Sequence, residues 1–406
     1  MISKQEMTEA CKVQKNRLMN SKSYQRETLC GIPKKLHDFA LVISGIRRCG
    51  KSTLMGQMMS EAEKQGQTVF YLNFDMPQAY GFAFDDFRIV DEILSEKQYD
   101  MLFFDEIQVV NGWEMYVRGK LDEGRKVVVT GSNASMLSRE LGTKLTGRHI
   151  TRELFPFSYR EFCGYQALSV GETSLRQYLN TGGFPKYVET GEDELLEELV
   201  KDILYRDIVV RYNLRDERIL KLILSLLLSN VGNLVTASKL KQLLGVRSVS
   251  TITDYFSFFE QTYLLAFVPK FAYSIKAQLV NPRKVYCVDN GIVSAVYRSF
   301  SRNDGHKLEN MVYCHLRRSY KEIFYFNDGT GECDFIVADG GIPQMAIQVC
   351  WQLTAENRDR EVKGLCIAMS ALNVENGYLL TFNQNDKIVE EGKIIQVRPV
   401  YEWASM

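Results

Sequence analysis

Residues 45–52, GIRRCGKS, have the composition and spacing of a loop that binds phosphate. Gly45 and Gly50 allow the backbone to wrap so that successive N–H groups point at phosphate oxygens. Lys51 would reach the β- and γ-phosphates of ATP, and the Ser52 hydroxyl would hold Mg²⁺. An apolar run precedes the loop and a helical pattern follows it, which favours a P-loop over an ordinary glycine turn. The residues expected around the nucleotide are Gly45, Ile46, Arg47, Arg48, Cys49, Gly50, Lys51, Ser52 and Thr53.

An acidic pair ends the apolar run MLFFDE, about 50 residues after the loop. Asp105 would hold the hydration shell of Mg²⁺ next to Ser52. Glu106 would act as the general base that polarises the attacking water. A solvated strand end is the alternative, because acidic pairs cap many strands, but the P-loop upstream favours the catalytic interpretation.

Small polar residues end a third apolar run, VVVTGSNAS. Thr130, Ser132 or Asn133 would hydrogen-bond the γ-phosphate or the attacking water, and we assign this catalytic role to Asn133 with Ser132 left open. Serine and asparagine are also ordinary turn residues, so the structural alternative has equal weight.

Arg148, in KLTGRHI, is a candidate for stabilising the charge that develops on the γ-phosphate. If a neighbouring subunit supplies it, Arg148 would couple hydrolysis to assembly of a homo-oligomer. The alternative is a structural ion pair, which surface arginines commonly form. Arg47 and Arg48, inside the loop, contact phosphate or face solvent.

These side chains require a parallel sheet to bring them together. Strands are expected at 40–44, 68–75, 100–106 and 126–132, and helices at 53–64 and 85–97. Near-continuous apolar strands that alternate with helices indicate an α/β fold whose sheet is buried on both faces.

Composition limits the remaining possibilities. The chain has 406 residues and no net charge, so no global field draws it to nucleic acid or to an anionic membrane. Nine cysteines lie without CxxC pairs, which argues against a zinc site or a disulfide framework and fits a reducing cytoplasm. We expect a cytoplasmic protein without a membrane segment, because there is no signal peptide and the apolar runs are too short.

The middle of the chain reads as helices, with a hinge or helix start at GGFP, residues 182–185. Residues 236–271 predict a helix-turn-helix unit. Its second helix, 248–260, contains neither lysine nor arginine, so we favour packing over DNA recognition. Its aromatic residues recur at helical spacing and are expected in the core; they are Tyr255, Phe256, Phe258 and Phe259.

Taken together, SGIRRCGKST, LFFDEIQ, VVVTGSNASML, LTGR with ELFPFSYREF, and GGFP resemble prokaryotic AAA-type ATPases. YRDIVVRYNLRD and KVYCVDNGI resemble the middle of the same proteins. The resemblance implies a P-loop NTPase parallel sheet of the ASCE type, then a helical and winged-helix region, then a small α/β restriction-endonuclease-like domain of unknown function. The expected domains are 1–164 (ATPase), 165–230 (helical), 231–298 (winged-helix-like) and 299–406 (nuclease-like). The roles given above to Lys51, Ser52, Asp105, Glu106, Ser132 or Asn133, and Arg148 are those that the resemblance implies.

The nuclease-like part departs from its pattern. Nucleases of the PD-(D/E)xK type use an Asp and a D/E-x-K pair on adjacent strands, often with a Glu from the preceding helix. Glu309 and Asp334 are present, but Gln348 and Cys350 stand in place of the acid and the lysine. Glu332 could substitute for one carboxylate, whereas nothing nearby replaces the lysine. We therefore expect no nuclease activity.

The predicted function is hydrolysis of ATP to ADP and phosphate with Mg²⁺, coupled to movement of the C-terminal domains. The alternative is a slowly hydrolysing, nucleotide-gated switch that binds DNA or a protein partner through an inactive nuclease-like domain.

Overall fold

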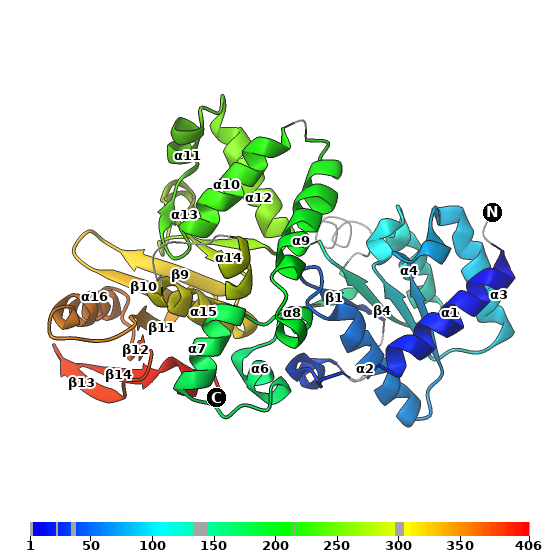
Figure 1. The fold of residues 1–406 in the computed structure, drawn as a ribbon, viewed down its shortest axis with the longest axis horizontal. Coiled ribbons are helices and arrows are strands. Elements are labelled where there is room, and N and C mark those ends of the chain that lie inside the picture. The colour runs from blue at the N-terminus through cyan, green and yellow to red at the C-terminus, as the bar shows by residue number, and fades with distance from the viewer. Residues whose placement is uncertain are drawn as a thin grey trace. The chain divides into compact units, whose positions relative to one another are not determined.

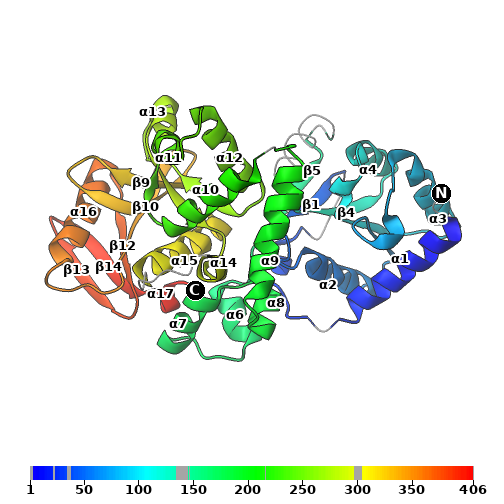
Figure 2. The same cartoon turned by 45° about the horizontal axis from the view of Figure 1, so that its top comes forward.

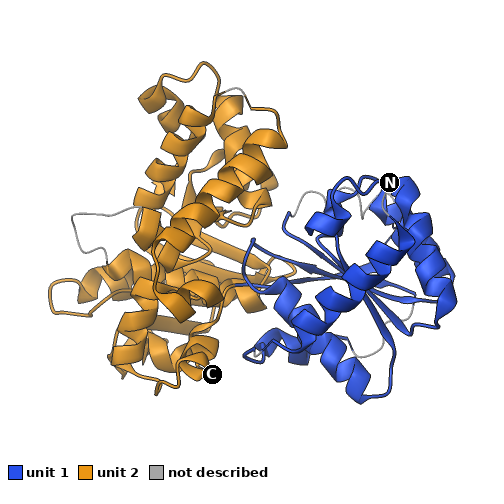
Figure 3. Ribbon diagram, turned by 45° about the vertical axis from the view of Figure 1, so that its right-hand side comes forward, with its two compact units in different colours: residues 1–155 blue, residues 156–406 orange. Residues whose placement is uncertain are grey.

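A computed structural model describes residues 3–21, 23–33, 38–133, 145, 147–214, 216–296 and 304–405. The chain divides into two compact units, Met1–Phe155 and Pro156–Met406 (Figure 3). The four predicted domains are finer than this division and stay a prediction. The predicted boundary at 298/299 lies outside the described residues.

The first unit is built on a five-stranded parallel sheet in the order β2-β3-β4-β1-β5. Because β4 lies between β1 and β3, the carboxyl ends of these three strands meet at one edge of the sheet. This arrangement confirms the predicted P-loop sheet. The strands are β1 (Ala40–Ser44), β2 (Val69–Asn73), β3 (Met101–Asp105), β4 (Lys126–Gly131) and β5 (His149–Glu153).

Helices cover both faces of this sheet (Figures 1 and 2). The crossover from β1 to β2 runs across the sheet in the opposite direction to the crossovers β2–β3 and β3–β4. Because such crossovers are right-handed, α2 packs on one face and α3 and α4 on the other. The helices of the unit are α1 (Lys4–Met19), α2 (Lys51–Lys64), α3 (Phe87–Glu96) and α4 (Trp113–Asp122).

An aromatic core fixes the sheet against α3 and α4. Phe104 of β3 is fully buried and contacts Phe70, Phe74 and Tyr116 at ring-centroid distances of 5.9 to 6.1 Å. Offset and edge-to-face pairs of this kind stabilise a core beyond the area they bury. The edge that carries the polar side chains is therefore held on a rigid support.

The second unit begins with helices. They are α6 (Tyr159–Tyr165), α7 (Glu172–Thr181), α8 (Pro185–Thr190), α9 (Glu194–Asp202), a π-helical segment (Ile203–Val210) and α10 (Glu217–Ser229). GGFP is a helix start, because Pro185 occupies the first turn of α8, where its missing N–H costs nothing.

A three-stranded antiparallel sheet in the order β6-β8-β7 follows, with helices between and after its strands. Tyr255, Phe256 and Phe259 of α12 are buried, as predicted, and Phe258 stacks on Tyr212 at 3.9 Å. The elements are β6 (Leu234–Val235), α11 (Ala237–Leu244), α12 (Val249–Gln261), β7 (Leu265–Val268), α13 (Ile275–Val280), β8 (Arg283–Cys287) and α14 (Asn290–Val296).

The C-terminal part contains a six-stranded mixed sheet in the order β13-β14-β12-β11-β10-β9, with α16 packed on β10, β11 and β12. The apolar runs IFYFND, CDFIVAD, QMAIQVCW and GYLLTFN predict strands at 323–328, 333–339, 344–351 and 377–383, after a helix near 308–320. All of these elements are present, with ends shifted by a few residues. The elements are α15 (Asp304–Ser319), β9 (Glu322–Asn327), β10 (Glu332–Asp339), β11 (Ile342–Val349), α16 (Arg358–Ala371), β12 (Asn376–Thr381), β13 (Asp386–Glu390), β14 (Lys393–Pro399) and α17 (Val400–Trp403).

Candidate active site

The loop between β1 and α2 has the backbone that its two glycines predict. Gly45 and Gly50 have φ angles of +139° and +106°, in the left-handed region that favours glycine. A Cβ atom at Gly45 would overlap the carbonyl oxygen of Leu154. Gly50 is the N-cap of α2, so the unpaired N–H groups and the positive end of the helix dipole lie at the loop. This is a backbone arrangement suited to phosphate oxygens.

Arg26 stabilises this loop through hydrogen bonds, a role that the sequence did not indicate. Its side chain is buried, and its guanidinium donates to the carbonyl of Cys49 at 2.9 Å and to that of Phe155 at 2.7 Å. The Cys49 thiol points into the protein and donates to the Leu154 carbonyl at 3.3 Å. The thiol of Cys49 therefore faces away from the phosphate site, and its backbone N–H donates to the Ile46 carbonyl at 3.4 Å.

The first residues of α2 carry the two side chains predicted to meet the nucleotide and the metal ion. Lys51 is buried, and its Nζ donates to the carbonyls of Gly45 and Ile46, each at 3.2 Å. The same Nζ lies 3.5 Å from Glu106 Oε1. Burial opposes the charge on Lys51, but Glu106 and neighbouring anionic groups outweigh it and raise its pKa.

Asp105 ends β3 and is fully buried. Its carboxylate accepts hydrogen bonds from the hydroxyls of Ser52 and Thr130 and, at 2.8 Å, from that of Tyr71. Burial raises its pKa and adjacent Glu106 raises it further, while these hydrogen bonds oppose the rise. The oxygens of Ser52 and Asp105 are adjacent, and they are the hard ligands that Mg²⁺ prefers, so these residues fit the predicted metal ion.

Glu106 adopts a left-handed backbone conformation, with φ of +52°, that is strained for a residue with a Cβ. Its N–H donates to Thr130 Oγ1 at 2.8 Å, which holds this conformation. Burial alone would raise the pKa of Glu106, but Lys51 and a hydrogen bond from Gln108 hold it below its usual value. Glu106 is therefore ionised near neutral pH, as a general base must be.

The end of β4 contributes the third group of side chains. Ser132 is buried and donates to Glu106 Oε2 at 3.3 Å. Asn133 is also buried at this edge of the sheet. Thr130, rather than either of these, bridges Asp105 and the backbone of Glu106. The roles of Ser132 and Asn133 as sensing groups stay predictions.

Arg148 lies where the parallel strands begin, at the end of the sheet opposite the P-loop. It directly precedes β5, and Ala40, the first residue of β1, donates its N–H to the Arg148 carbonyl at 3.0 Å. The guanidinium is ion-paired with Asp122 and donates to the Asp38 carbonyl at 2.9 Å. Because the P-loop follows the opposite end of β1, Arg148 lies away from the P-loop of its own chain. Its predicted role at a γ-phosphate therefore stays a prediction that needs a neighbouring subunit, and its contacts here are those of the alternative, a structural ion pair.

Arg47 lies 3.8 Å from Asp75, and Arg48 is exposed with a left-handed backbone. Two side chains that meet Asp105 were not anticipated, Tyr71 and Asn73, the second at 3.2 Å. Both lie on β2, two residues apart, so they share one side of the strand. A polar residue at the end of the strand FYLN was the signal that could have indicated them.

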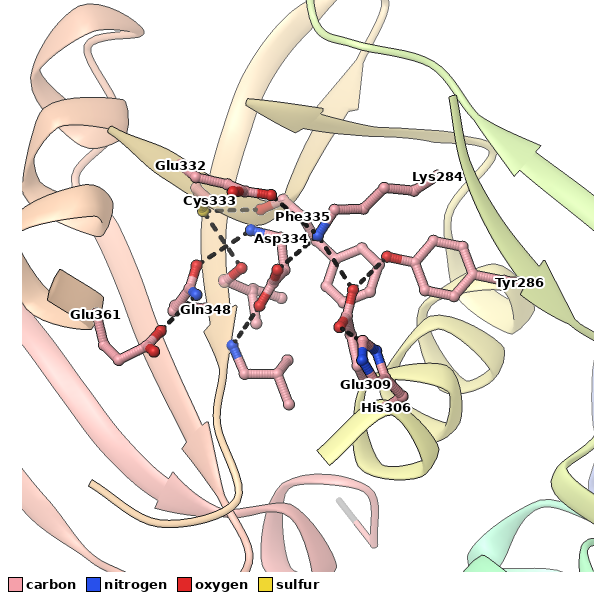
Figure 4. A network of polar contacts seen from close by, with 12 residues as sticks. Lys284, Tyr286, His306, Glu309, Glu332, Cys333, Asp334, Phe335, Gln348 and Glu361 are labelled. Atoms are coloured by element: carbon pink, nitrogen blue, oxygen red, sulfur yellow. Dashed lines mark hydrogen bonds and ion pairs between the residues drawn. The ribbon is translucent and has the colours of Figure 1, made fainter. Parts of the chain in front are cut away.

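A second polar cluster lies in the other unit, around the nuclease-like positions (Figure 4). Lys284 of β8 is buried, and its Nζ lies 2.7 Å from Asp334, 3.2 Å from Glu309 and 3.5 Å from Glu332. The expectation that no lysine stands near these carboxylates is therefore wrong. It failed because Lys284 is 50 residues away from Asp334 in sequence and comes from another sheet.

The remaining nuclease-like positions are occupied by other contacts. Gln348 accepts a hydrogen bond from the Asp334 N–H at 3.1 Å and donates to Glu361 at 2.7 Å. Cys350 packs into the apolar core of this part of the chain. The cluster lines a cavity of about 710 Å³. Within the described residues, no group of three or more His, Cys, Asp or Glu side chains is arranged to hold a metal ion.

Comparisons with known proteins match two family models to successive parts of the chain. A family model described as an AAA domain matches residues 37–163, and one described as a domain of unknown function (DUF8612) matches residues 172–303. No helix in the described ranges is both long and apolar enough to cross a membrane.

Among solved structures, the replication initiator DnaA bound to AMPPCP and single-stranded DNA matches with 18% identity and a TM-score of 0.30. The match covers 61% of this chain and 86% of that one. Cdc6p from Pyrobaculum aerophilum matches with 11% identity and a TM-score of 0.29, over 69% of this chain and 97% of that one. At these TM-scores neither match supports a functional argument.

Two curated proteins are similar over most of their length. An uncharacterized protein of Haemophilus influenzae is 32% identical over 320 residues, covering 74% of this chain and 79% of that protein. An uncharacterized protein of Methanocaldococcus jannaschii is 31% identical over 403 residues, covering 92% of this chain and 89% of that protein. The chain, with its match to an AAA domain near the N-terminus, therefore belongs to the same family as the M. jannaschii protein.

Proposed function

We propose that this chain is a Mg²⁺-dependent ATPase that hydrolyses ATP to ADP and phosphate. The observation that carries the proposal is the convergence of Lys51, Ser52, Asp105 and Glu106 on one edge of the sheet. Lys51 lies 3.5 Å from Glu106, and Ser52 hydrogen-bonds to Asp105, although more than 50 residues separate the two pairs.

Each side chain has one task in the proposed reaction. The loop amides and Lys51 bind the phosphates, and Lys51 stabilises charge on the γ-phosphate in the transition state. Glu106 takes a proton from the attacking water. Ser52 and Asp105 would hold Mg²⁺, which supplies further charge stabilisation when it is bound.

ATP turnover of purified protein tests the proposal. Lys51→Ala and Glu106→Gln should each lower kcat/KM by about 100-fold or more, since each removes an interaction with the transition state. Lys64→Ala and Glu61→Gln, which change exposed residues near the end of the same helix, are the matched controls. Equal turnover in the wild type and in both active-site variants would refute the proposal.

We further propose that hydrolysis moves the second unit, which contains a winged-helix-like part (231–298) and a nuclease-like part (299–406). The nuclease-like interpretation is supported by the placement of Asp334 and Gln348 on adjacent strands, β10 and β11, with Glu309 on the preceding helix. Lys284 is already ion-paired with Asp334 and Glu309, and Gln348 brings no charge for a metal ion. DNA incubated with Mg²⁺ or Mn²⁺ should therefore stay intact, and cleavage by pure protein would contradict this inactivity.

A nucleotide-gated switch is the second candidate. The cluster around Lys284 favours it, because Asp334 and Glu309 are ion-paired with this lysine inside the protein. Turnover measured over a range of protein concentrations, with and without DNA, separates the two. A motor that assembles should hydrolyse faster per subunit at high concentration, whereas a switch should stay slow throughout.

A further inference from the structure

Gln108 lies two residues after Glu106, in a single turn of 3-10 helix formed by Ile107–Val109. Its side chain is nine-tenths buried. Its Nε2 donates to Glu106 Oε2 and lies 3.5 Å from Ser132 Oγ. This contact fixes which end of the amide is which, because an ionised carboxylate accepts hydrogen bonds and cannot donate one.

The other end of the same amide has no such partner. Gln108 Oε1 is buried and accepts no hydrogen bond from any residue that the structure describes. A buried amide oxygen without a donor costs free energy that a neighbouring apolar side chain would avoid. Next to a proposed general base, the donor it fits is a water molecule or a ligand hydroxyl.

The backbone explains how the two side chains meet. Glu106 has φ of +52°, and its N–H is held by Thr130 at 2.8 Å. The chain then turns through the 3-10 segment, which returns Gln108 to the carboxylate of Glu106. A strained residue followed by a tight turn is an arrangement that positions side chains at functional sites.

We propose that Gln108 positions the water that attacks ATP, an inference that rests on the proposed ATPase function. Nε2 holds Glu106 in place, and Oε1 accepts one hydrogen of the water while Glu106 accepts the other. The water oxygen forms a bond to the γ-phosphorus, and the bond from that phosphorus to the bridging oxygen breaks. The bridging oxygen leaves on ADP with the electron pair, and the abstracted proton passes to Glu106.

This role differs from one in which Gln108 only stabilises the fold. A positioning residue contributes to kcat and not to nucleotide binding, because it touches the water and the base but no phosphate. Its contribution also depends on Glu106. Gln108→Met should therefore lower kcat in the wild-type protein but have little effect on kcat in the Glu106→Gln variant.

The test is a double-mutant cycle on full-length protein with Gln108→Met, Glu106→Gln and both together, and Gln65→Met, at an exposed position, as the control. Gln108→Met should lower kcat by about 10- to 100-fold, within the range of general-base catalysis, with KM for ATP changed by less than about threefold. Binding of a nonhydrolysable ATP analogue should be unchanged, which shows that the loop is folded. In the Glu106→Gln background, Gln108→Met should lower the residual rate by less than about twofold.

Two results would overturn the inference alone. One is a wild-type kcat in Gln108→Met; the other is the same fold loss in both backgrounds together with weaker analogue binding, which indicates a structural role. No turnover in the wild-type protein would instead overturn the ATPase proposal, and the inference with it.

Discussion

At the scale of single residues, a few side chains of the site each make several contacts. Thr130 bridges the carboxylate of Asp105 and the backbone of Glu106. Lys51 contacts the loop carbonyls and Glu106 with one ammonium group. A substitution at either residue removes several interactions together, so its effects should not add to those of its neighbours.

Arg148 gives the first prediction at this scale. Its ion pair with Asp122 is a structural contact in the same chain, whereas the oligomer model needs Arg148 at a neighbour's γ-phosphate. If Arg148 acts in trans, Arg148→Ala should lower kcat by about tenfold or more, since it removes charge stabilisation in the transition state. Asp122→Ala removes only the ion pair and should leave kcat near that of the wild type. Equal rates for the two variants, measured at high protein concentration, would assign Arg148 a purely structural role.

The residues predicted from sequence are those that a local pattern marks. Lys51, Ser52, Asp105 and Glu106 stand at fixed positions around two strand ends, and strand order alone brings them together. Arg26, Gln108 and Lys284 belong to no recognisable sequence motif. The partners of Arg26 are 23 and 129 residues away, that of Gln108 is 2 residues away, and those of Lys284 are 25 and 50 residues away. Only the folded backbone decides which polar group each side chain meets.

At the scale of elements, apolar strands were predictable and polar ones were not. The buried strands β1, β3 and β4 read as continuous apolar runs in the sequence. β5 was not anticipated, because HITRE is a partly exposed edge strand that pairs with β1 alone. The sheet order was also beyond the sequence, since a short apolar strand does not specify its neighbours.

The glycines before α8 provide a prediction at this scale. Gly182 has φ of +70°, and a Cβ there would overlap the carboxylate of Asp289. Gly182→Ala should cost about 3 kcal/mol of unfolding free energy, from backbone strain and from overpacking together. Gly191 has the same φ but open space around its Cα. Gly191→Ala should lower the unfolding free energy by only about 1 kcal/mol. Urea unfolding of both variants measures these losses. Similar losses in the two variants would show that backbone strain alone accounts for the effect.

Asp289, the carboxylate next to Gly182, should make the stability of the protein depend on pH. It accepts hydrogen bonds from the N–H groups of Gly183 at 2.6 Å and Gly291 at 2.8 Å. Burial raises its pKa to about 7 despite these hydrogen bonds, whereas an unfolded Asp titrates near 4. The folded state therefore binds the Asp289 proton more tightly than the unfolded state does. This protonation contributes fully to stability below about pH 4, and the contribution is lost as the pH rises through about 7.

Asp289→Asn removes this titration. The unfolding free energy of the variant minus that of the wild type should thus rise between pH 4 and pH 7 and stay level above about pH 8. Urea unfolding across this range measures it, with Asp254→Asn, an exposed position on α12, as the control. A difference that does not change with pH would mean that Asp289 has the same pKa in the folded and the unfolded protein.

At the scale of the whole molecule, the question is how the nucleotide site communicates with the second unit. The last residues of the first unit hydrogen-bond to the P-loop region. Leu154 donates its N–H to the Ser44 carbonyl at 2.7 Å, and Arg26 joins the carbonyls of Cys49 and Phe155. The next residue, Pro156, opens the second unit, and its carbonyl accepts a hydrogen bond from Arg318 of α15 at 2.7 Å.

These contacts form a continuous route from the phosphate loop to the helix that carries Glu309. Spatial continuity alone does not establish coupling, so the route needs a direct test. Hydrogen exchange with and without a nonhydrolysable ATP analogue provides one. Backbone amides of residues 45–53 should exchange more slowly with the analogue, because binding stabilises the loop. If the route transmits the change, amides of α15 (Asp304–Ser319) should respond as well.

Arg26→Met separates transmission from binding. The variant loses both hydrogen bonds that tie Cys49 to Phe155 but keeps every side chain proposed to touch the nucleotide. The analogue should still slow exchange at residues 45–53, whereas the response at α15 should disappear. An α15 response that survives in Arg26→Met would mean that the signal travels by another path. The absence of any α15 response in the wild type would mean that the ATP site acts without moving this helix, and the coupled-movement proposal would then fail while ATP hydrolysis itself could stand.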